Sequence, residues 1–191
     1  SGHGLSYALS GNYMTSDGYR DNSDTRVRDA GLNLDYYANK RLQLNLSGGY
    51  HEDKTGLPGA IKQSDFEAGA SREDTFHPDD YADVEDYYLQ GGPTLYFLSN
   101  SFFKVDMSFR NRQSLFFSSF TGGTYEGDTE IESITVSPQL VMRGKILGLA
   151  NNLTFGMDYF NDEEDITNTA SFSGAQVFDL EKKNYGFYIH D

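Results

Sequence analysis

Residues 42–51 read LQLNLSGGYH, and this stretch decides the fold because apolar and polar side chains alternate along it on either side of the glycine pair at 48–49. Alternation with a period of two is typical of a β-strand whose two faces meet different surroundings. The wall of a membrane β-barrel turns the apolar face to lipid and the polar face to a watery lumen. The apolar set is Leu42, Leu44, Leu46, Gly48 and Tyr50, and the polar set is Gln43, Asn45, Ser47, Gly49 and His51.

The same alternation recurs along the whole chain and predicts an all-β fold. We expect an antiparallel meander of about eight strands that forms part of a transmembrane β-barrel, with residues 1–191 as one partial barrel domain. The strands are expected at about 4–14, 26–37, 42–51, 87–97, 102–112, 131–142, 151–160 and 182–190.

The connections between these strands are expected to alternate in length. Tight turns at 38–41 and 98–101 and a short link at 143–150 separate long polar stretches. Outer-membrane barrels have this asymmetry, with short periplasmic turns and long extracellular loops, whereas structureless loops longer than about 12–15 residues are uncommon in compact domains. The long outer loops are expected at 15–25, 52–86, 113–130 and 161–181.

Composition excludes several classes of protein. The net charge of −14 argues against a nucleic-acid partner, which needs a basic surface. The absence of cysteine excludes disulfides, cysteine-held zinc and thiol catalysis. The sequence has no apolar run of about 18 residues, so no transmembrane helix is expected. No nucleophile elbow, P-loop or dinucleotide fingerprint is present, so we do not expect an enzyme.

Aromatic residues gather toward the ends of the expected strands. Tyr and Phe, 14 of each, supply all the aromatic mass because the chain has no Trp. Rings with one wet edge favour the boundary between membrane and water, so the pattern favours two aromatic girdles. The alternative is that aromatic residues are simply common in strands. The end-of-strand set includes Tyr13, Tyr36, Tyr37, Tyr50, Tyr87, Tyr88, Tyr96, Phe97, Phe102, Phe103, Phe109, Tyr159, Phe160, Tyr185 and Phe187.

Three local strings resemble the barrel of TonB-dependent outer-membrane receptors. They are DGYRDNS at 17–23, GLPG at 56–59 and YGFYIHD at 185–191. In that family a similar Gly-Tyr-Arg string follows an early strand, Leu-Pro-Gly opens the next outer loop, and a tyrosine-to-aspartate string ends a mid-barrel strand. The resemblance covers essentially the whole chain and implies a section of a barrel of about 22 strands.

The resemblance also implies a function in uptake across the bacterial outer membrane. Family members carry scarce nutrients such as metal–siderophore complexes, haem, cobalamin or glycans, and are driven by the TonB complex through an N-terminal plug domain. The sequence shows no plug, no TonB box and no closing aromatic strand, so we expect a segment of a longer receptor. Because unpaired sheet edges are not viable in lipid, such a segment must close on itself, pair with another copy or fold differently in solution.

Two other functions remain open from the sequence. A small outer-membrane barrel could serve as an adhesin or a structural protein. A soluble acidic β-sandwich could bind carbohydrate, and would then bury its apolar faces in a dry core. On the leading interpretation the partners are outer-membrane lipid, a small-molecule nutrient and, through the missing plug, the TonB complex.

The substrate-binding candidates are three arginines and a run of aromatic residues. Guanidinium groups pair well with carboxylates, so arginines in the lumen or outer loops could meet an anionic siderophore, although salt bridges to nearby Asp are the simpler interpretation. An exposed aromatic cluster on an outer loop could grip a ligand, or could be the upper end of two tall strands. The candidates are Arg20, Arg110, Arg112, Phe116, Phe117, Phe120 and Tyr125.

No resident cofactor is expected, but an outer loop could hold calcium. Asp79, Asp80, Asp83 and Asp86 offer the hard oxygen ligands that Ca²⁺ prefers, and some cobalamin receptors of the family order their loops with calcium. A solvated acidic loop is the simpler interpretation. The four histidines, His3, His51, His77 and His190, lack metal-ligand spacing.

Overall fold

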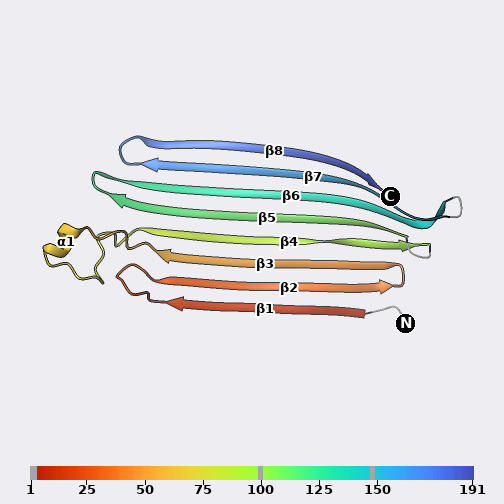
Figure 1. The fold of residues 1–191 in the computed structure, drawn as a ribbon, viewed down its shortest axis with the longest axis horizontal. Coiled ribbons are helices and arrows are strands. Elements are labelled where there is room, and N and C mark those ends of the chain that lie inside the picture. Colours follow the sequence, from red (N-terminus) through yellow and green to blue (C-terminus); the bar gives the residue numbers. More distant parts are fainter. Residues whose placement is uncertain (1–3, 99–100, 147–148) are drawn as a thin grey trace.

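The computed structural model describes residues 4–98, 101–146 and 149–191, which form one eight-stranded antiparallel sheet. Each strand pairs with the next along the chain, so the spatial order is β1 to β8 without a crossover (Figure 1). The strands are β1 (Gly4–Ser16), β2 (Thr25–Asn39), β3 (Leu42–Gly56), β4 (Tyr81–Phe97), β5 (Ser101–Phe120), β6 (Gly123–Ile146), β7 (Leu149–Ala170) and β8 (Gly174–His190). The all-β meander predicted from the alternation is confirmed.

The connections fall at two ends of the sheet. We call distal the end that carries the connections 17–24, 57–80, 121–122 and 171–173, and proximal the end at which β1 begins and β8 ends (Figure 1). The short helix α1 (Gln63–Glu67) lies in the longest distal connection. Among the described residues no helix is long and apolar enough to cross a membrane.

The distal strands are much longer than the sequence predicted. The expected loops 113–130 and 161–181 shrink to turns at 121–122 and 171–173, and the loops 15–25 and 52–86 shrink to 17–24 and 57–80. The prediction failed there because both faces of these extensions meet water, so the simple apolar alternation stops while the backbone pairing continues. The proximal turns 98–101 and 143–150 lie partly outside the described residues.

The sheet has two faces that the strand register keeps separate. Leu46 of β3 is paired with Leu34 of β2 and Gly91 of β4, and Asn45 is paired with Asp35 and Gly92. Because paired residues point to the same side, every strand contributes to both faces. We call the face that carries Leu46 the outer face and the face that carries Asn45 the inner face.

In the part of the chain that the structure describes, no second sheet or helical layer covers either face. Among the described hydrophobic residues only Val141 and Ala170 are buried, while Leu9, Leu89 and Phe187 are more than half exposed. A β-sandwich would bury these side chains between two sheets, so the expectation of a dry core made for a soluble sandwich is wrong for this fold. The sheet is also open, because β1 pairs only with β2 and β8 only with β7 in the described chain.

Tyrosine rings cover glycines on the inner face at two places. Gly49 is paired with Tyr88 and Gly156 with Tyr188. A Cβ added at Gly49 would lie 2.5 Å from the Tyr88 ring, and one added at Gly156 would lie 2.1 Å from the Tyr188 ring. Each ring therefore occupies the space that a side chain would need, which is why a strand interior tolerates glycine there.

Candidate ligand-binding face

An apolar belt crosses the proximal half of the outer face from edge to edge. Its members are aliphatic, aromatic and proline side chains at alternate positions of all eight strands. Pro93 and Pro138 belong to it, and they lack the N–H that a ladder hydrogen bond needs. The belt comprises Leu5, Tyr7, Leu9, Leu32, Leu34, Leu44, Leu46, Leu89, Pro93, Leu95, Phe103, Val105, Met107, Val136, Pro138, Leu140, Leu153, Phe155, Met157, Phe187 and Ile189.

An aromatic row marks the distal boundary of the belt. Tyr50 is paired with Tyr87, whose ring centroid lies 6.1 Å from that of Phe109. The rings of Tyr159 and Tyr185 lie 5.1 Å apart. Rings that combine an apolar body with a polar edge suit an interface between hydrocarbon and water.

The apolar belt of the outer face ends at the aromatic row. There the outer face becomes acidic, and two rungs of carboxylates cross three strands: Glu132, Glu163 and Glu181 form one rung, and Glu130, Asp165 and Asp179 form the other. Carboxylates placed opposite one another on neighbouring strands repel each other and destabilise a sheet. So many of them side by side therefore need water around them to screen the repulsion. The row therefore separates an apolar zone from an aqueous zone.

Repulsion within the acidic rungs is visible at Asp165, which lies in the aqueous zone six residues beyond Tyr159. Partial loss of hydration between the strands raises the pKa of its carboxyl, and the neighbouring charges of Asp179 and Glu130 raise it further. Asn111 offsets part of the repulsion by donating hydrogen bonds to Glu130 (2.7 Å) and Glu132 (3.1 Å). Lys183 forms an ion pair with Glu181.

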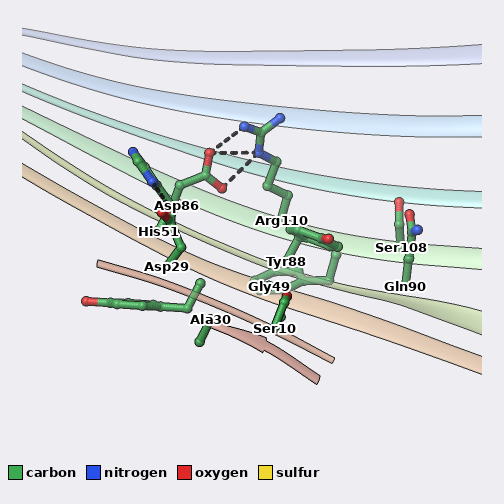
Figure 2. Close-up of a pocket in the computed structure, with 13 residues that line it drawn as sticks. Ser10, Asp29, Ala30, Gly49, His51, Asp86, Tyr88, Gln90, Ser108 and Arg110 are labelled. Atoms are coloured by element: carbon green, nitrogen blue, oxygen red, sulfur yellow. Dashed lines mark hydrogen bonds and ion pairs between the residues drawn. The ribbon is translucent and has the colours of Figure 1, made fainter. Parts of the chain in front are cut away.

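The inner face carries two pairs of polar side chains at the height of the aromatic row. The Asp29 carboxylate lies 2.7 Å from Nδ1 of His51 and accepts a hydrogen bond from Asn12. Arg110 donates from Nε to both oxygens of Asp86, at 3.0 and 3.2 Å, and its terminal nitrogen makes a further short contact (Figure 2). Both pairs border an open hollow of about 660 Å³, whose floor includes Tyr88.

The three candidate arginines have different environments. Arg110 forms a salt bridge with Asp86, which is the simpler of the two interpretations that the sequence allowed. Arg112 is paired in register with Asp86 and Ile131 on the same face, is exposed, and forms no ion pair within the described chain. Arg20 donates to the carbonyls of Pro58, Gly59 and Asp74 in the 57–80 connection, so it has a structural contact there.

The candidate aromatic residues are split between the two faces. Phe116 and Tyr125 lie together on the inner face, with ring centroids 6.2 Å apart, and the Tyr125 hydroxyl donates to Asn168 at 2.7 Å. Phe120 continues this inner set, and its ring lies 6.1 Å from Phe172. Phe117 points to the outer face, where it stacks on Tyr81. The sequence placed all four in a loop and could not assign them to faces.

The four candidate calcium ligands lie in different surroundings. Asp79 is exposed, whereas Asp80 is buried and accepts hydrogen bonds from the backbone and hydroxyl groups of Ser119. Asp83 lies on the outer face, and Asp86 lies on the inner face with Arg110. Within the ranges that the structure describes, no three His, Asp or Glu side chains are grouped so that they could hold a metal ion.

The sequence did not identify the contacts that hold the 57–80 connection. The Asn22 amide, in a backbone conformation with φ of 55°, donates to the carbonyls of Leu57 (3.3 Å), His77 (2.6 Å) and Asp80 (2.8 Å). Nδ1 of His77 lies 3.0 Å from both Ser119 Oγ and Asp80 Oδ2. The connection is thereby tied to the β1–β2 connection and to the distal end of β5. His51 and His190 lie on the inner face, and His3 lies outside the described residues.

Comparison with known proteins identifies this architecture. No protein-family model matches the chain, and no curated protein matches its sequence. Among solved structures, 96% of the chain superposes on the unliganded ferric citrate transporter FecA with a TM-score of 0.75 and 15% identity, covering 29% of that chain. The FpvAI–pyocin S2 complex matches 97% of the chain, with a TM-score of 0.75, 10% identity and 31% coverage.

A third structure gives the same result. BauA, the ferric preacinetobactin receptor from Acinetobacter baumannii, matches 95% of the chain with a TM-score of 0.65 and 11% identity, covering 30% of that chain. The chain thus spans under a third of the length of these structures. At such low identity the likeness shows the fold alone, and it confirms the barrel-wall fold that the sequence resemblance implied.

Proposed function

We propose that the chain is a section of the barrel wall of an outer-membrane receptor that takes up a scarce nutrient, such as a metal–siderophore complex or cobalamin, with energy from the TonB complex. The observation that carries the proposal is the apolar belt, which is exposed, continuous over eight strands and bounded by the aromatic row. An exposed apolar belt of this kind suits contact with lipid hydrocarbon. The function of the protein would be transport, and no catalytic step is proposed.

In this role the inner face lines the lumen and contacts the nutrient. The hollow beside Asp86 and Arg110 combines charged groups with the Tyr88 ring, as ligand sites commonly do. The Phe116–Tyr125 pair lies at the distal end, where a ligand would enter. The unpaired edges of β1 and β8 would continue into neighbouring strands of the wall, because lipid tolerates no open sheet edge.

Uptake by cells that produce the full-length protein containing this chain tests the proposal. The probes are ferric citrate, a ferric catecholate, a ferric hydroxamate, haemin and cobalamin, each isotopically labelled. We expect accumulation of at least one probe that depends on the protein and is lost in cells without TonB. The proposal fails if no probe accumulates, or if accumulation persists at the same rate without TonB.

Location is tested separately by fractionating the same cells. We expect the protein in the outer-membrane fraction, with release only by detergent and heat-dependent migration on gels. Recovery in the aqueous fraction would contradict the barrel assignment. An outer-membrane protein that transports none of the probes but binds cells or surfaces would favour the adhesin alternative.

A further inference from the structure

The longest connection at the distal end, residues 57–80, carries α1 and lies beyond the ends of β3 and β4 (Figure 1). A surface connection of this length is ordinarily mobile, because it makes few contacts with the elements that it joins. This connection is instead bound on two sides, by the β1–β2 connection at 17–24 and by the distal end of β5. We call residues 57–80 the distal brace.

The β1–β2 connection holds both ends of the distal brace. Arg20 and Asn22 donate side-chain hydrogen bonds to carbonyls within 57–59 and within 74–80. Between them, the backbone N–H of Asp21 donates to the carbonyl of Glu73 at 2.8 Å. The acceptors are main-chain groups at both ends of the brace, so its backbone path is fixed there and only the part around α1 projects away from these contacts.

The distal end of β5 holds the brace from the other side. The carboxylate of Asp80 is buried, and it accepts hydrogen bonds from the backbone N–H of Ser119 at 2.8 Å and from the Ser119 hydroxyl at 2.6 Å. Nδ1 of His77 lies 3.0 Å from the same carboxylate. Hydrogen bonds to a charged group are roughly twice as strong as those between neutral groups, so lifting the brace away from β5 would break a strong contact.

The surfaces that meet at the brace are closely packed. Gly59 has a φ of +63°, and a Cβ added there would lie 2.3 Å from the His77 ring, which joins the two ends of the brace to each other. A Cβ added at Gly56, where β3 enters the brace, would lie 2.6 Å from the Asn22 side chain. Packed surfaces of this kind have discrete arrangements and do not deform continuously.

We propose that the distal brace stays closed throughout nutrient capture, so that this side of the outer mouth is a fixed wall and not a moving lid. A hollow of about 390 Å³ lies between the brace, which contributes Phe76 and His77, and the end of β5, which contributes Phe120. Because the brace keeps the two walls of this hollow apart at a fixed spacing, the hollow is formed before any ligand arrives. Binding there would then lose no entropy in ordering the wall. The inference rests on the proposed receptor function and says which part of the mouth does not move.

A disulfide that locks the brace tests the inference. The backbone hydrogen bond between Asp21 and Glu73 brings their Cα atoms to a separation that a disulfide can span, and both side chains are exposed. The sequence has no cysteine of its own, so Asp21→Cys with Glu73→Cys introduces one pair. Thr169→Cys with Ala175→Cys, a cross-strand pair beside the 171–173 turn, is the matched control.

Uptake is measured in cells that produce each full-length variant, oxidised and then reduced, with labelled ferric citrate, ferric catecholate, ferric hydroxamate, haemin and cobalamin. We expect the oxidised lock to transport its probe at a rate within about twofold of the reduced protein, as the control pair does, because no opening of the brace is needed. Uptake that stops on oxidation of the lock alone and returns on reduction would show that the brace is a lid. The receptor function would then stand and only this inference would be wrong.

A measurement without nutrient checks the brace independently of transport. A nitroxide on Arg72→Cys, an exposed position next to Glu73, is compared in lipid nanodiscs with one on Thr167→Cys in β7. We expect similarly slow rotation of both labels, and rotation at position 72 that becomes several-fold faster when Arg20→Gln and Asn22→Gly remove the ties. Rotation at position 72 that is fast from the start and unchanged by these substitutions would overturn the inference, whether or not a probe is transported.

Discussion

At the scale of single residues, the inner face depends on glycines that accommodate tyrosine rings. Replacing Gly49 by alanine would place a Cβ 2.5 Å from the Tyr88 ring, so the ring must move or the strands must separate. Overpacking of this kind costs about 1–3 kcal/mol. We expect Gly49→Ala to lower the temperature at which the protein loses its folded migration on gels.

Two further variants isolate this contact. Gly11→Ala is the matched control, because its added Cβ meets only a backbone oxygen at 3.7 Å. Tyr88→Ala added to Gly49→Ala should recover part of the lost stability, since the clashing ring is gone. Equal stability of Gly49→Ala and Gly11→Ala would contradict the packing seen here.

Asn22 is the second residue on which local order depends. Its amide donates to three backbone carbonyls of the 57–80 connection, and a buried carbonyl left without a donor costs about 1–3 kcal/mol. We expect Asn22→Gly, which tolerates the positive φ but lacks the amide, to speed proteolysis within 57–80 by about tenfold. Unchanged cleavage, with cleavage at 171–173 as the internal reference, would contradict this.

At the scale of elements, the acidic rungs across β6, β7 and β8 predict a pH dependence. The carboxyl of Asp165 has a raised pKa in the folded protein, because of desolvation first and then of the charges on Asp179 and Glu130. Its ionised form therefore opposes folding of the extensions, and its protonation as the pH falls through the folded pKa favours folding.

Asp165→Asn should consequently stabilise this region at pH 7 and lose its advantage as the pH is lowered. Amide exchange of 161–181, followed by mass spectrometry, should be slower in the variant at pH 7 and should converge with the wild type in mild acid. Lys183→Gln, which removes the ion pair to Glu181, should act in the opposite direction. If the slowing of amide exchange by Asp165→Asn became larger as the pH falls, the raised pKa of Asp165 would be wrong.

The strands could be predicted from the sequence in the proximal half of the sheet but not in the distal extensions. Alternation at 42–51 or 102–110 located strands correctly because one face of each is apolar and the other polar. The same reasoning stopped at 113–130 and 161–181, where the outer face is acidic and the inner face mixes Ile166 and Phe178 with polar residues. Strand pairing there is a long-range property that local polarity does not encode.

The candidate site was predictable only in part, for the same reason. Arg110, Arg112, Phe116 and Tyr125 were identified by residue type, and the structure places all four on the inner face. Phe117 could not be separated from Phe116 without the register, which puts it on the opposite face.

At the scale of the whole molecule, the sheet is a section of a wall whose stability requires its surroundings. Only two hydrophobic side chains of the described residues are buried, so the sheet lacks the core that holds a soluble domain together. Lipid on the outer face and neighbouring strands at β1 and β8 would supply the missing contacts. Without them, the exposed belt and edges would favour association between chains.

Accessibility of single nitroxide labels in a bilayer tests the central claim most directly. Labels at Leu46, Met107 and Val136 on the outer face are compared with labels at Asn45, Ser108 and Thr135 on the inner face, in the full-length protein. We predict that the outer set collides with lipid-soluble oxygen and that the inner set collides with a water-soluble nickel chelate. Equal access of both sets to the nickel chelate, or exclusion of the outer set from oxygen, would contradict the account.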